Sequence, residues 1–558
     1  MNEAASVVWV ISLPLLGALL ATVWRQRAAT IGWVSSALTA GCAVWLLWVV
    51  QHAGVQELAL GGWEIGLGIS LYADGLAAVM VLMSNLVVLG CSVYARHYFR
   101  AQRQHELFWP LWLLLATALN ALFLAGDLFN VYVTLELLGI SASALTALGA
   151  KRAALRAALR YLVVGLLGSM LYLMAITLLY AAYGTLNAVQ IAEALHVNPL
   201  GWAALLLMLA GLALKMALFP LHFWLPPAHS NAPAPVSAAL SALVVKAAFY
   251  LVVRLWFEVF APLTTPLLAN VLGALGAMAV LWGSWSALRA ERLKLLAAYS
   301  SVAQLGYLVM FFPLLMVLEG EARQWLFGAM VLFALSHAFA KSALFLAAGI
   351  LLQYAGHDRI RELSGTTQAL PLTTFVIALA GIALVGLPPS GAFLGKWYLL
   401  DAAFKTGQWW WVLVLVAGSL LATAYVFRLL GHAFGHLPAV KRPVVAATQE
   451  IPALALALLA TFGLGLRGNE FVVMVGADWH GGRAMNELLN VLTDALGENL
   501  PLWIVLSSFS VGLVIFFVQE SSHRLRTTLN LLAAVVKLAL VGVLLWGCIT
   551  GRCTKCAG

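Results

Sequence analysis

The chain has 558 residues, of which 63% are hydrophobic and only 9% are charged, and its formal net charge is +9. A soluble domain carries about 25% charged residues, so this composition excludes a water-soluble globular protein. Many apolar runs reach the roughly 20 residues that cross a bilayer as a helix. They are continuous rather than alternating, which excludes a membrane β-barrel. The sequence therefore predicts an all-α polytopic membrane protein, whose excess positive charge indicates cytoplasmic loops rather than nucleic-acid binding.

About sixteen membrane spans are predicted in chain order from the apolar runs. They lie near 5–24, 31–51, 73–94, 107–125, 128–149, 159–181, 202–219 with a broken continuation to about 232, 236–257, 267–288, 293–313, 325–352, 371–404 with a break, 409–434, 451–467, 501–518 and 529–549. The first run has no basic start, so we expect a retained span rather than a cleaved signal.

The loops between these spans alternate in charge. Basic loops follow the odd-numbered spans, at 24–27, 94–103, 151–160, 288–294, 357–362, 440–442 and 523–526. The loops between them, such as 51–64 and 187–199, are poor in Arg and Lys. Because cytoplasmic loops carry the excess of basic residues, this alternation predicts that both termini lie on the outer, periplasmic side of the inner (plasma) membrane.

Two spans are interrupted by proline. The segment LALKMALFPLHFWLPPAHSNAPAP (212–235) has five prolines after Lys215, and GIALVGLPPSGAFLGKWYLL (381–400) has two adjacent prolines before Lys396. Proline removes a backbone donor, and unsatisfied backbone in a membrane is tolerated only in a protein interior or a wet cavity. Interrupted helices at matching places in two halves predict an internal repeat around a transport site.

This punctuation divides the chain into four regions. They are the N-terminal helices one to three (1–106), a first repeat of helices four to eight (107–258), a second repeat of helices nine to thirteen (259–435) and a C-terminal region (436–558). In the last region AMNELLNVLTDAL (484–496) predicts an amphipathic helix on the outer surface. A CxxC at Cys553 and Cys556 lacks a second ligand pair, so we expect a plain tail rather than a metal site.

Several ionisable residues lie inside predicted spans, where each costs at least about 2.5–3.5 kcal/mol on insertion scales. They are Glu136, Lys215, Lys246, His337, Lys341 and Lys396, with Lys294 at the mouth of a span. Snorkelling to the interface is an alternative for Lys294 and Lys151 near span ends. It explains Lys215 and Lys246 poorly, because these lie near span centres. The set as a whole therefore favours function over structure.

Buried lysine has the chemistry of a proton relay. Burial disfavours its charged form, and a nearby carboxylate restores it. A Glu136–Lys215 pair that opens and closes would therefore switch the lysine between holding and releasing a proton. The other members, Lys246, His337, Lys341 and Lys396, would form a line of stations linked by water. Arginine would not serve, because it does not give up its proton.

His222 and His229 lie among the prolines of the first interrupted span. Neutral histidine both donates and accepts, so these residues are candidates for passing protons; equally, they would satisfy backbone groups that the prolines free. A zinc site is disfavoured, because no Cys, Asp or Glu stands close by to complete it. The chain has no P-loop, no GxGxxG after a strand and no cysteine set for an iron–sulfur cluster. We therefore expect no cofactor and no enzymatic chemistry in this chain.

Five blocks carry a resemblance to a known family. They are GDLFNVYVTLELLGISASALTALG (126–149), KMALFPLHFWLPPAHSNAPAPVSAALSALVVK (215–246), LKLLAAYSSVAQLGY (293–307), SHAFAKSALFLAAG (336–349) and GLPPSGAFLGKW (386–397). Together they resemble the antiporter-like subunits of respiratory complex I, membrane-bound hydrogenases and Mrp-type cation/proton antiporters, over roughly residues 70 to 435. GDLFN before the glutamate and the lysine of GKW look most like the D-type Mrp subunit.

The resemblance implies fourteen core helices in two inverted five-helix repeats with broken helices, here with about two extra C-terminal helices. It implies a central hydrophilic axis of Lys, Glu and His. Within that axis Glu136 matches the key glutamate and Lys215 its paired lysine, while Lys246 matches the linking lysine. Lys396 matches the lysine of the second half, and His337 and Lys341 the residues between. Asp127 matches the GD of the family and is expected at an ion entrance.

The resulting hypothesis is a proton-translocating subunit of a multisubunit Na⁺/H⁺ antiporter. Its partners would be other membrane subunits, protons, Na⁺ and the lipid bilayer. One alternative is the pump module of a redox complex, such as NADH-quinone oxidoreductase or a membrane-bound hydrogenase, with the redox chemistry in partner subunits. Another is a proton-coupled partner in an inorganic-carbon uptake complex. The extra C-terminal spans depart from the D-type pattern and leave the complex open.

Overall fold

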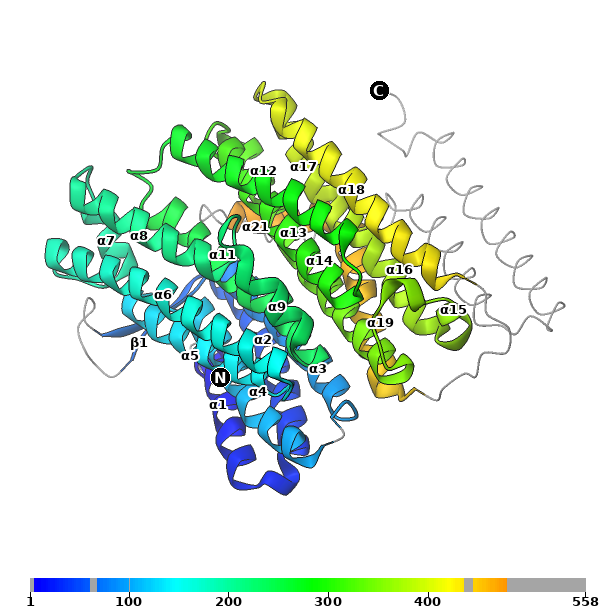
Figure 1. Cartoon of the computed structure of the whole chain (residues 1–558). Coiled ribbons are helices and arrows are strands. Elements are labelled where there is room, and N and C mark those ends of the chain that lie inside the picture. Colours follow the sequence, from blue (N-terminus) through cyan, green and yellow to red (C-terminus); the bar gives the residue numbers. More distant parts are fainter. Residues whose placement is uncertain (1–4, 61–67, 100, 436–444, 479–558) are drawn as a thin grey trace, which may run out of the picture. The chain divides into compact units, whose positions relative to one another are not determined.

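A computed structural model describes residues 5–60, 68–99, 101–435 and 445–478, all within one compact unit, residues 1–482 (Figure 1). Twelve helices of this part are long and apolar enough to cross a membrane, which confirms the predicted all-α polytopic class. The predicted spans 501–518 and 529–549, the segment 484–496 and the CxxC tail lie outside the described residues.

The unbroken helices follow the predicted spans closely. They are α1 (Ala5–Val23), α2 (Ala28–Ala53), α3 (Gly75–Ala95), α4 (Gln102–Phe123), α5 (Leu128–Ala147), α6 (Arg152–Tyr183), α12 (Pro266–Arg289), α13 (Leu293–Leu315), α14 (Gly320–Ala355) and α18 (Trp410–Ala433). Shorter elements in the connections are η1 (Arg25–Arg27), α7 (Ala188–Ala194), η5 (Ile360–Glu362) and α15 (Thr366–Ala369).

Two further spans contain π-helical turns. The eighth predicted span consists of α10 (Ala234–Ala239), the π-turn η3 (Leu240–Val244), α11 (Val245–Arg254) and the π-turn η4 (Leu255–Val259). The fourteenth consists of α19 (Ala447–Leu458), the π-turn η6 (Leu459–Gly463) and α20 (Leu464–Leu466). Beyond its predicted end at 467 the chain forms another helix, α21 (Gly468–Asp478), which was not predicted.

Both broken spans are confirmed. In the first, α8 (Pro199–Lys215) ends at Lys215, and the chain continues through the 3₁₀ turn η2 (Leu221–Trp224) and the short helix α9 (Leu225–Asn231). In the second, α16 (Pro371–Val385) ends before Gly386, whose φ of +80° suits glycine. The helix then restarts as α17 (Gly391–Lys405), where the Ser390 side chain accepts from Phe393 N.

A β-hairpin corrects the expectation of purely helical structure. β1 (Gln56–Leu60) pairs antiparallel with β2 (Ile69–Ala73), in the region where a plain loop 51–64 was predicted. The amide of Tyr72 also donates to Leu124 O at the end of α4, at 2.8 Å. The strands are only five residues long, and this anchor lies about fifty residues away, so periodicity within the segment does not reveal it.

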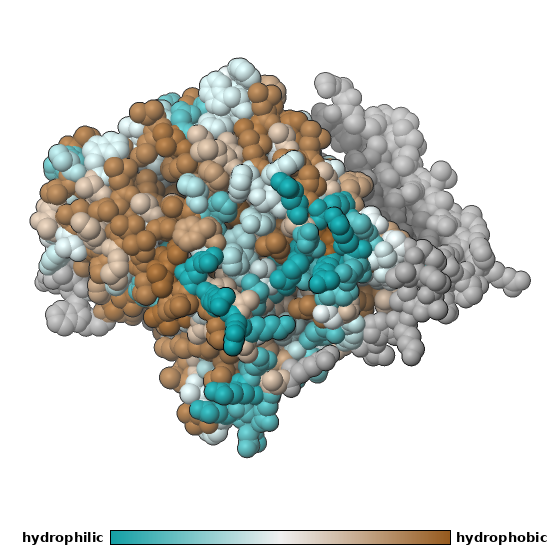
Figure 2. Space-filling view, viewed as in Figure 1, coloured by the Kyte–Doolittle hydropathy of each residue, from teal (hydrophilic) through white to brown (hydrophobic). Residues whose placement is uncertain are grey.

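The most deeply buried spans are Ala234–Val259, Leu293–Leu315 and Gly320–Ala355. They are the same three spans that carry Lys246, Lys294 and the His337–Lys341 pair. By contrast, Figure 2 shows extensive brown, apolar surface over the helices that surround them. An apolar exterior around a core that contains lysines is the reverse of a soluble protein, and it suits a protein whose solvent is lipid.

Candidate functional site

Four ionisable residues form a central cluster, which we define as His229, Lys246, His337 and Lys341. The side chains of Lys246 and Lys341 are fully buried, and both histidines are buried as well. Lys246 and Lys341 lie within electrostatic range of each other and of both histidines. These residues come from three elements: the short helix α9 of the first broken span, α11 and α14. The fold thus brings together residues more than one hundred positions apart in the sequence.

The ammonium groups of the cluster bind neutral oxygen atoms. Lys246 Nζ donates to Ser241 O at 2.7 Å, and this carbonyl belongs to the π-turn η3, which directly precedes α11. Lys341 Nζ donates to Ala297 O at 2.7 Å and to Ser300 Oγ. π-turns inside α-helices are rare and occur frequently at functional sites. Here the turn supplies the acceptor that a buried cation requires.

Lys396 has a similar arrangement in the second broken span. Its Nζ donates to Val385 O, the last residue of α16, at 2.9 Å and to Ser419 Oγ at 3.0 Å. It also stands 4.3 Å from the centroid of the Tyr307 ring. The side chain folds back past Gly386, where a Cβ would lie 2.8 Å from Lys396 Cδ. The break therefore places a cation at the carbonyl end of a half-helix, where positive charge is favoured.

The inner helix α13 carries a polar stripe that connects Lys341 with Lys396. Ser300 accepts from Lys341, and one turn later Gln304 Nε2 donates to Leu384 O at 2.8 Å. Leu384 is adjacent to Val385, which accepts from Lys396. Sequence reasoning missed this stripe, although polar residues three or four positions apart in an otherwise apolar run are its signature.

Glu136 and Lys215 come near each other without forming an ion pair. Lys215 passes α6, where a Cβ on Gly168 would lie 3.2 Å from its Cγ, and reaches α5 at Gly139, where a Cβ would lie 4.0 Å from Nζ. Gly139 is three residues after Glu136, whose charge acts on the lysine. Glu136 Oε1 is buried and has no hydrogen-bond partner within the part of the chain that the structure describes.

None of the lysines of the predicted pathway forms a salt bridge with another described residue. The ion pairs of the described chain involve His, Arg and the exposed Lys405 instead. Removing an unpaired charge from water is costly. The absence of carboxylate partners therefore distinguishes these lysines from a structural ion-pair network.

Lys294 does not snorkel, contrary to the alternative that its position suggested. Only 2% of the residue is exposed, and its Nζ donates to Ala232 O at the end of α9. Next to it, Arg292 pairs with Asp358 at 2.8 Å and points a second nitrogen at Ser230 O, 3.4 Å away. These cations satisfy carbonyls at the C-terminal end of α9, as expected from its dipole.

The prolines free backbone groups that other side chains satisfy. Trp224 Nε1 donates to Leu214 O at 2.9 Å, and Ser237 Oγ donates to His229 O at 2.7 Å. The backbone of Leu225, one helical turn earlier, lies within hydrogen-bonding range of the ring of His229, whereas Nδ1 of His222 has no hydrogen-bond partner among the described residues. Both expectations for these histidines, passing protons and satisfying freed backbone groups, therefore stay predictions.

Asp127 is the N-cap of α5. Its carboxylate accepts from Asn130 N at 2.7 Å and from Ser70 N at 3.1 Å, so it ties the helix to the β-hairpin. Burial raises the pKa of Asp127, although these backbone hydrogen bonds act in the opposite direction. Capping accounts for these contacts, and the expected ion entrance at Asp127 stays a prediction.

An ion cluster at the hairpin side of α11 was not predicted. Arg254 binds both carboxylate oxygens of Asp74, the N-cap of α3, and contacts Glu258 at 2.5 Å. Burial alone would raise the pKa of Asp74, but the guanidinium of Arg254 and the hydrogen bonds lower it below its ordinary value. The cluster lies two turns beyond Lys246 on the same helix.

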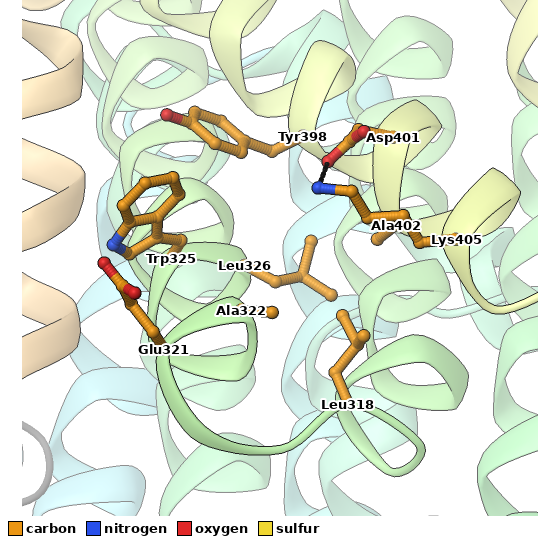
Figure 3. A pocket seen from close by; sticks show the side chains of 9 residues that line it. All are labelled: Leu318, Glu321, Ala322, Trp325, Leu326, Tyr398, Asp401, Ala402 and Lys405. Atoms are coloured by element: carbon orange, nitrogen blue, oxygen red, sulfur yellow. Dashed lines mark ion pairs between the residues drawn. The ribbon is translucent and has the colours of Figure 1, made fainter.

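A cavity of about 220 Å³ lies where the start of α14 meets the end of α17 (Figure 3). It is lined by Glu321 and Trp325 from α14 and by Tyr398 and Asp401 from α17. Asp401 pairs with Lys405 across one helical turn at 2.7 Å. The cavity thus lies at the C-terminal end of the helix that carries Lys396, and its lining combines charged and apolar side chains.

Comparison with known proteins gives consistent matches. The transmembrane family model described as NADH:quinone oxidoreductase/Mrp antiporter matches residues 125–422. The N-type subunit of NADH-quinone oxidoreductase from Desulforudis audaxviator is 36% identical over 461 residues, 79% of this chain and 87% of that protein. The D-type subunit of the Na(+)/H(+) antiporter from Bacillus subtilis is 29% identical over 477 residues, 82% and 94% respectively. A chain of the archaeal membrane-bound sulfane sulfur reductase aligns with TM-score 0.76 and 29% identity, covering 85% of this chain and 97% of that one.

Proposed function

Because the chain belongs to the NADH:quinone oxidoreductase/Mrp antiporter transmembrane family, we propose that it is the proton-translocating subunit of a multisubunit Na⁺/H⁺ antiporter. The observation that carries the proposal is that Lys246, Lys341 and Lys396 are buried, donate to neutral oxygen atoms and form no salt bridge with any described residue. A group in this state gains or loses a proton at less cost than one locked in an ion pair. The similarity to a D-type antiporter subunit supports the choice of complex.

In the proposed mechanism Glu136 controls the protonation of Lys215. When the carboxylate approaches the ammonium, Lys215 holds its proton; when the two separate, Lys215 releases the proton towards the central cluster. His229 lies among the lysines, and a neutral imidazole accepts on one nitrogen and donates from the other, so this residue is proposed to pass the proton. Lys246 and then Lys341 follow.

From Lys341 the proposed path follows the polar stripe of α13 to Lys396. Ser300 and Gln304 position the water that joins the two lysines, since a serine hydroxyl both donates and accepts. Lys294 is proposed to control the access of protons to His229 from the side of the basic loops. The cavity beside Asp401 is the proposed opening on the opposite side, and Asp127 is proposed to lie near an ion entrance of the first half.

The proposal extends to the assembly. The two broken spans would belong to inverted repeats, 107–258 and 259–435, that rock or gate around the axis. The chain would lie in the plasma membrane with both termini outside and would work with other membrane subunits. Na⁺ would be exchanged by the complex as a whole.

A redox-driven complex is the second candidate, because the relative with 36% identity is a subunit of NADH-quinone oxidoreductase. The two functions make different predictions for the purified assembly. A complex isolated from its native membrane through a tag on this chain should contain small multi-span antiporter subunits. If the complex instead contains iron–sulfur or hydrogenase subunits, that result would support the redox complex.

The transport test uses everted membrane vesicles that contain the complex. After a proton gradient is established, added NaCl should dissipate it by exchange, and an equal concentration of choline chloride should not. A gradient that is insensitive to Na⁺ in an intact complex would overturn the antiporter assignment. If oxidation of a reductant instead builds the gradient through this complex, the proton-translocating role stands and the second candidate replaces the first.

A further inference from the structure

A groove between α1 and α2 has no place in the proton pathway. It has a volume of about 1090 Å³ and lies in the part of the helical hairpin nearest its turn. Its floor is formed at Gly17, where a Cβ would lie only 2.3 Å from Ser35 Oγ, so the two helices touch there. Leu16 and Leu20 of α1 line it together with Val34 and Leu38 of α2. All four are exposed, which leaves an apolar trough open along the hairpin.

One end of the groove is basic. Arg25 and Arg27 stand in the turn η1 and are exposed, and the lining of the groove contains no acidic residue. The ion pairs of the described chain include neither guanidinium. In Figure 2 the bottom of the view, where Figure 1 places this turn, is teal beneath brown helix surface. Trp24 beside them is 58% exposed, and tryptophan is enriched at the membrane–water interface.

We propose that this groove binds one anionic phospholipid of the surrounding bilayer. Its phosphate binds Arg25 and Arg27, since guanidinium groups pair with phosphate in two parallel hydrogen bonds. An acyl chain lies along Leu16, Leu20 and Val34. The volume of about 1090 Å³ is slightly above the roughly 300–1,000 Å³ of small-molecule pockets. Basic pockets between membrane helices are known to bind acidic lipid headgroups.

The charge pattern favours this occupant over two others. A zwitterionic lipid carries a cation beside its phosphate, so a pair of arginines attracts it less. A transmembrane helix of a partner subunit would cover both guanidinium groups, and burying unpaired charges is costly. An apolar trough with free cations at one end matches a molecule with long apolar chains and one net negative headgroup.

Native mass spectrometry of the purified full-length chain tests the proposal. Dioleoyl phosphatidylglycerol and dioleoyl phosphatidylcholine are added separately after delipidation, and bound lipids per chain are counted. The wild type should bind one phosphatidylglycerol more tightly than any phosphatidylcholine. The double variant Arg25→Gln/Arg27→Gln should weaken that binding by roughly tenfold or more, since each basic residue near an anionic lipid contributes about a fivefold factor.

Two further variants separate the groove from general surface charge. Arg152→Gln/Arg156→Gln removes two exposed basic residues at the start of α6, outside the groove, and should bind phosphatidylglycerol like the wild type. Val34→Trp fills the trough and keeps both arginines, so it should also lose the tight lipid. The melting temperature of each variant without added lipid confirms that it is folded.

Three results would overturn the proposal. The first is equal phosphatidylglycerol binding by the wild type and by folded Arg25→Gln/Arg27→Gln. The second is equal retention of both lipids by the wild type, which would indicate unspecific bilayer contact. The third is a cross-link from a cysteine at Leu20 to a partner subunit in the intact complex, which would make the groove a helix–helix interface. The proposal does not depend on proton transport, so its failure leaves the proposed function untouched.

Discussion

The two broken spans share their construction but place their lysines in different surroundings. Lys215 ends the first half-helix, is only half-buried, and lies near Glu136 without a hydrogen bond of its own to a described residue. Lys396 follows the second break, is 5% exposed, and is held by Val385 O and Ser419 Oγ. The first lysine thus depends on a nearby carboxylate, while the second rests on fixed dipoles. The two breaks therefore differ in the chemistry that surrounds their lysines.

The largest effect is expected in the first half. Lys215→Ala or Glu136→Ala should reduce Na⁺-dependent proton transport in vesicles by about 10²-fold, a typical loss when a positioned proton-transfer group is removed. Immunoblots of the partner subunits show whether the complex still assembles. Near wild-type transport in both assembled variants would show that the pair is not the switch.

The variant Lys396→Arg tests whether the lysine of the second half carries protons. Arginine keeps the charge but does not release its proton, so transport should fall nearly as far as in the first half if Lys396 carries protons. Lys151→Arg is the matched control, because this lysine is exposed and lies outside the proposed path. Unimpaired transport by Lys396→Arg would make Lys396 a structural counter-charge.

A substitution in the polar stripe of α13, between the two halves, is expected to reduce transport less. Gln304→Leu removes the side chain that donates to Leu384 O and leaves both lysines in place. We expect roughly a tenfold loss of transport, because water between Lys341 and Lys396 loses one of its positioning groups. The variant Gln304→Glu restores a polar side chain and should recover part of the rate. If Gln304→Leu transports normally, protons do not follow the α13 stripe.

Substitutions of Asp127 are expected to have the smallest effect on transport. They distinguish a role in helix capping from a role in ion entry. Asp127→Asn keeps an N-cap and should transport normally if capping is the whole role, whereas Asp127→Ala should lose about 0.5–2 kcal/mol of stability. A transport defect in Asp127→Asn at unchanged melting temperature would favour the ion entrance.

The pH dependence of this pair follows from the raised pKa of Asp127. Between the ordinary aspartate pKa and the raised one, the folded wild type binds more protons than the unfolded chain. Its stability relative to Asp127→Asn should therefore fall as the pH rises through that interval. Thermal melting of both proteins over an acidic pH series measures this difference.

Most of the architecture followed from the sequence. Length and apolarity determine a membrane span almost alone, because lipid demands about 20 apolar residues and internally satisfied backbone. The prolines likewise placed both breaks, and Lys215 was expected where the first one begins. The β-hairpin and α21 were missed, because short elements depend on anchors that lie elsewhere in the chain.

The tertiary structure alone decided what surrounds each charge. Sequence placed Lys246 and Lys341 inside spans, but only packing brought them together with His229 and gave them Ser241 O and Ala297 O as acceptors. It also buried Lys294, for which position in the chain had suggested snorkelling. The physical reason is that the cost of a charge depends on the dipoles within a few ångströms, and those belong to helices distant in sequence.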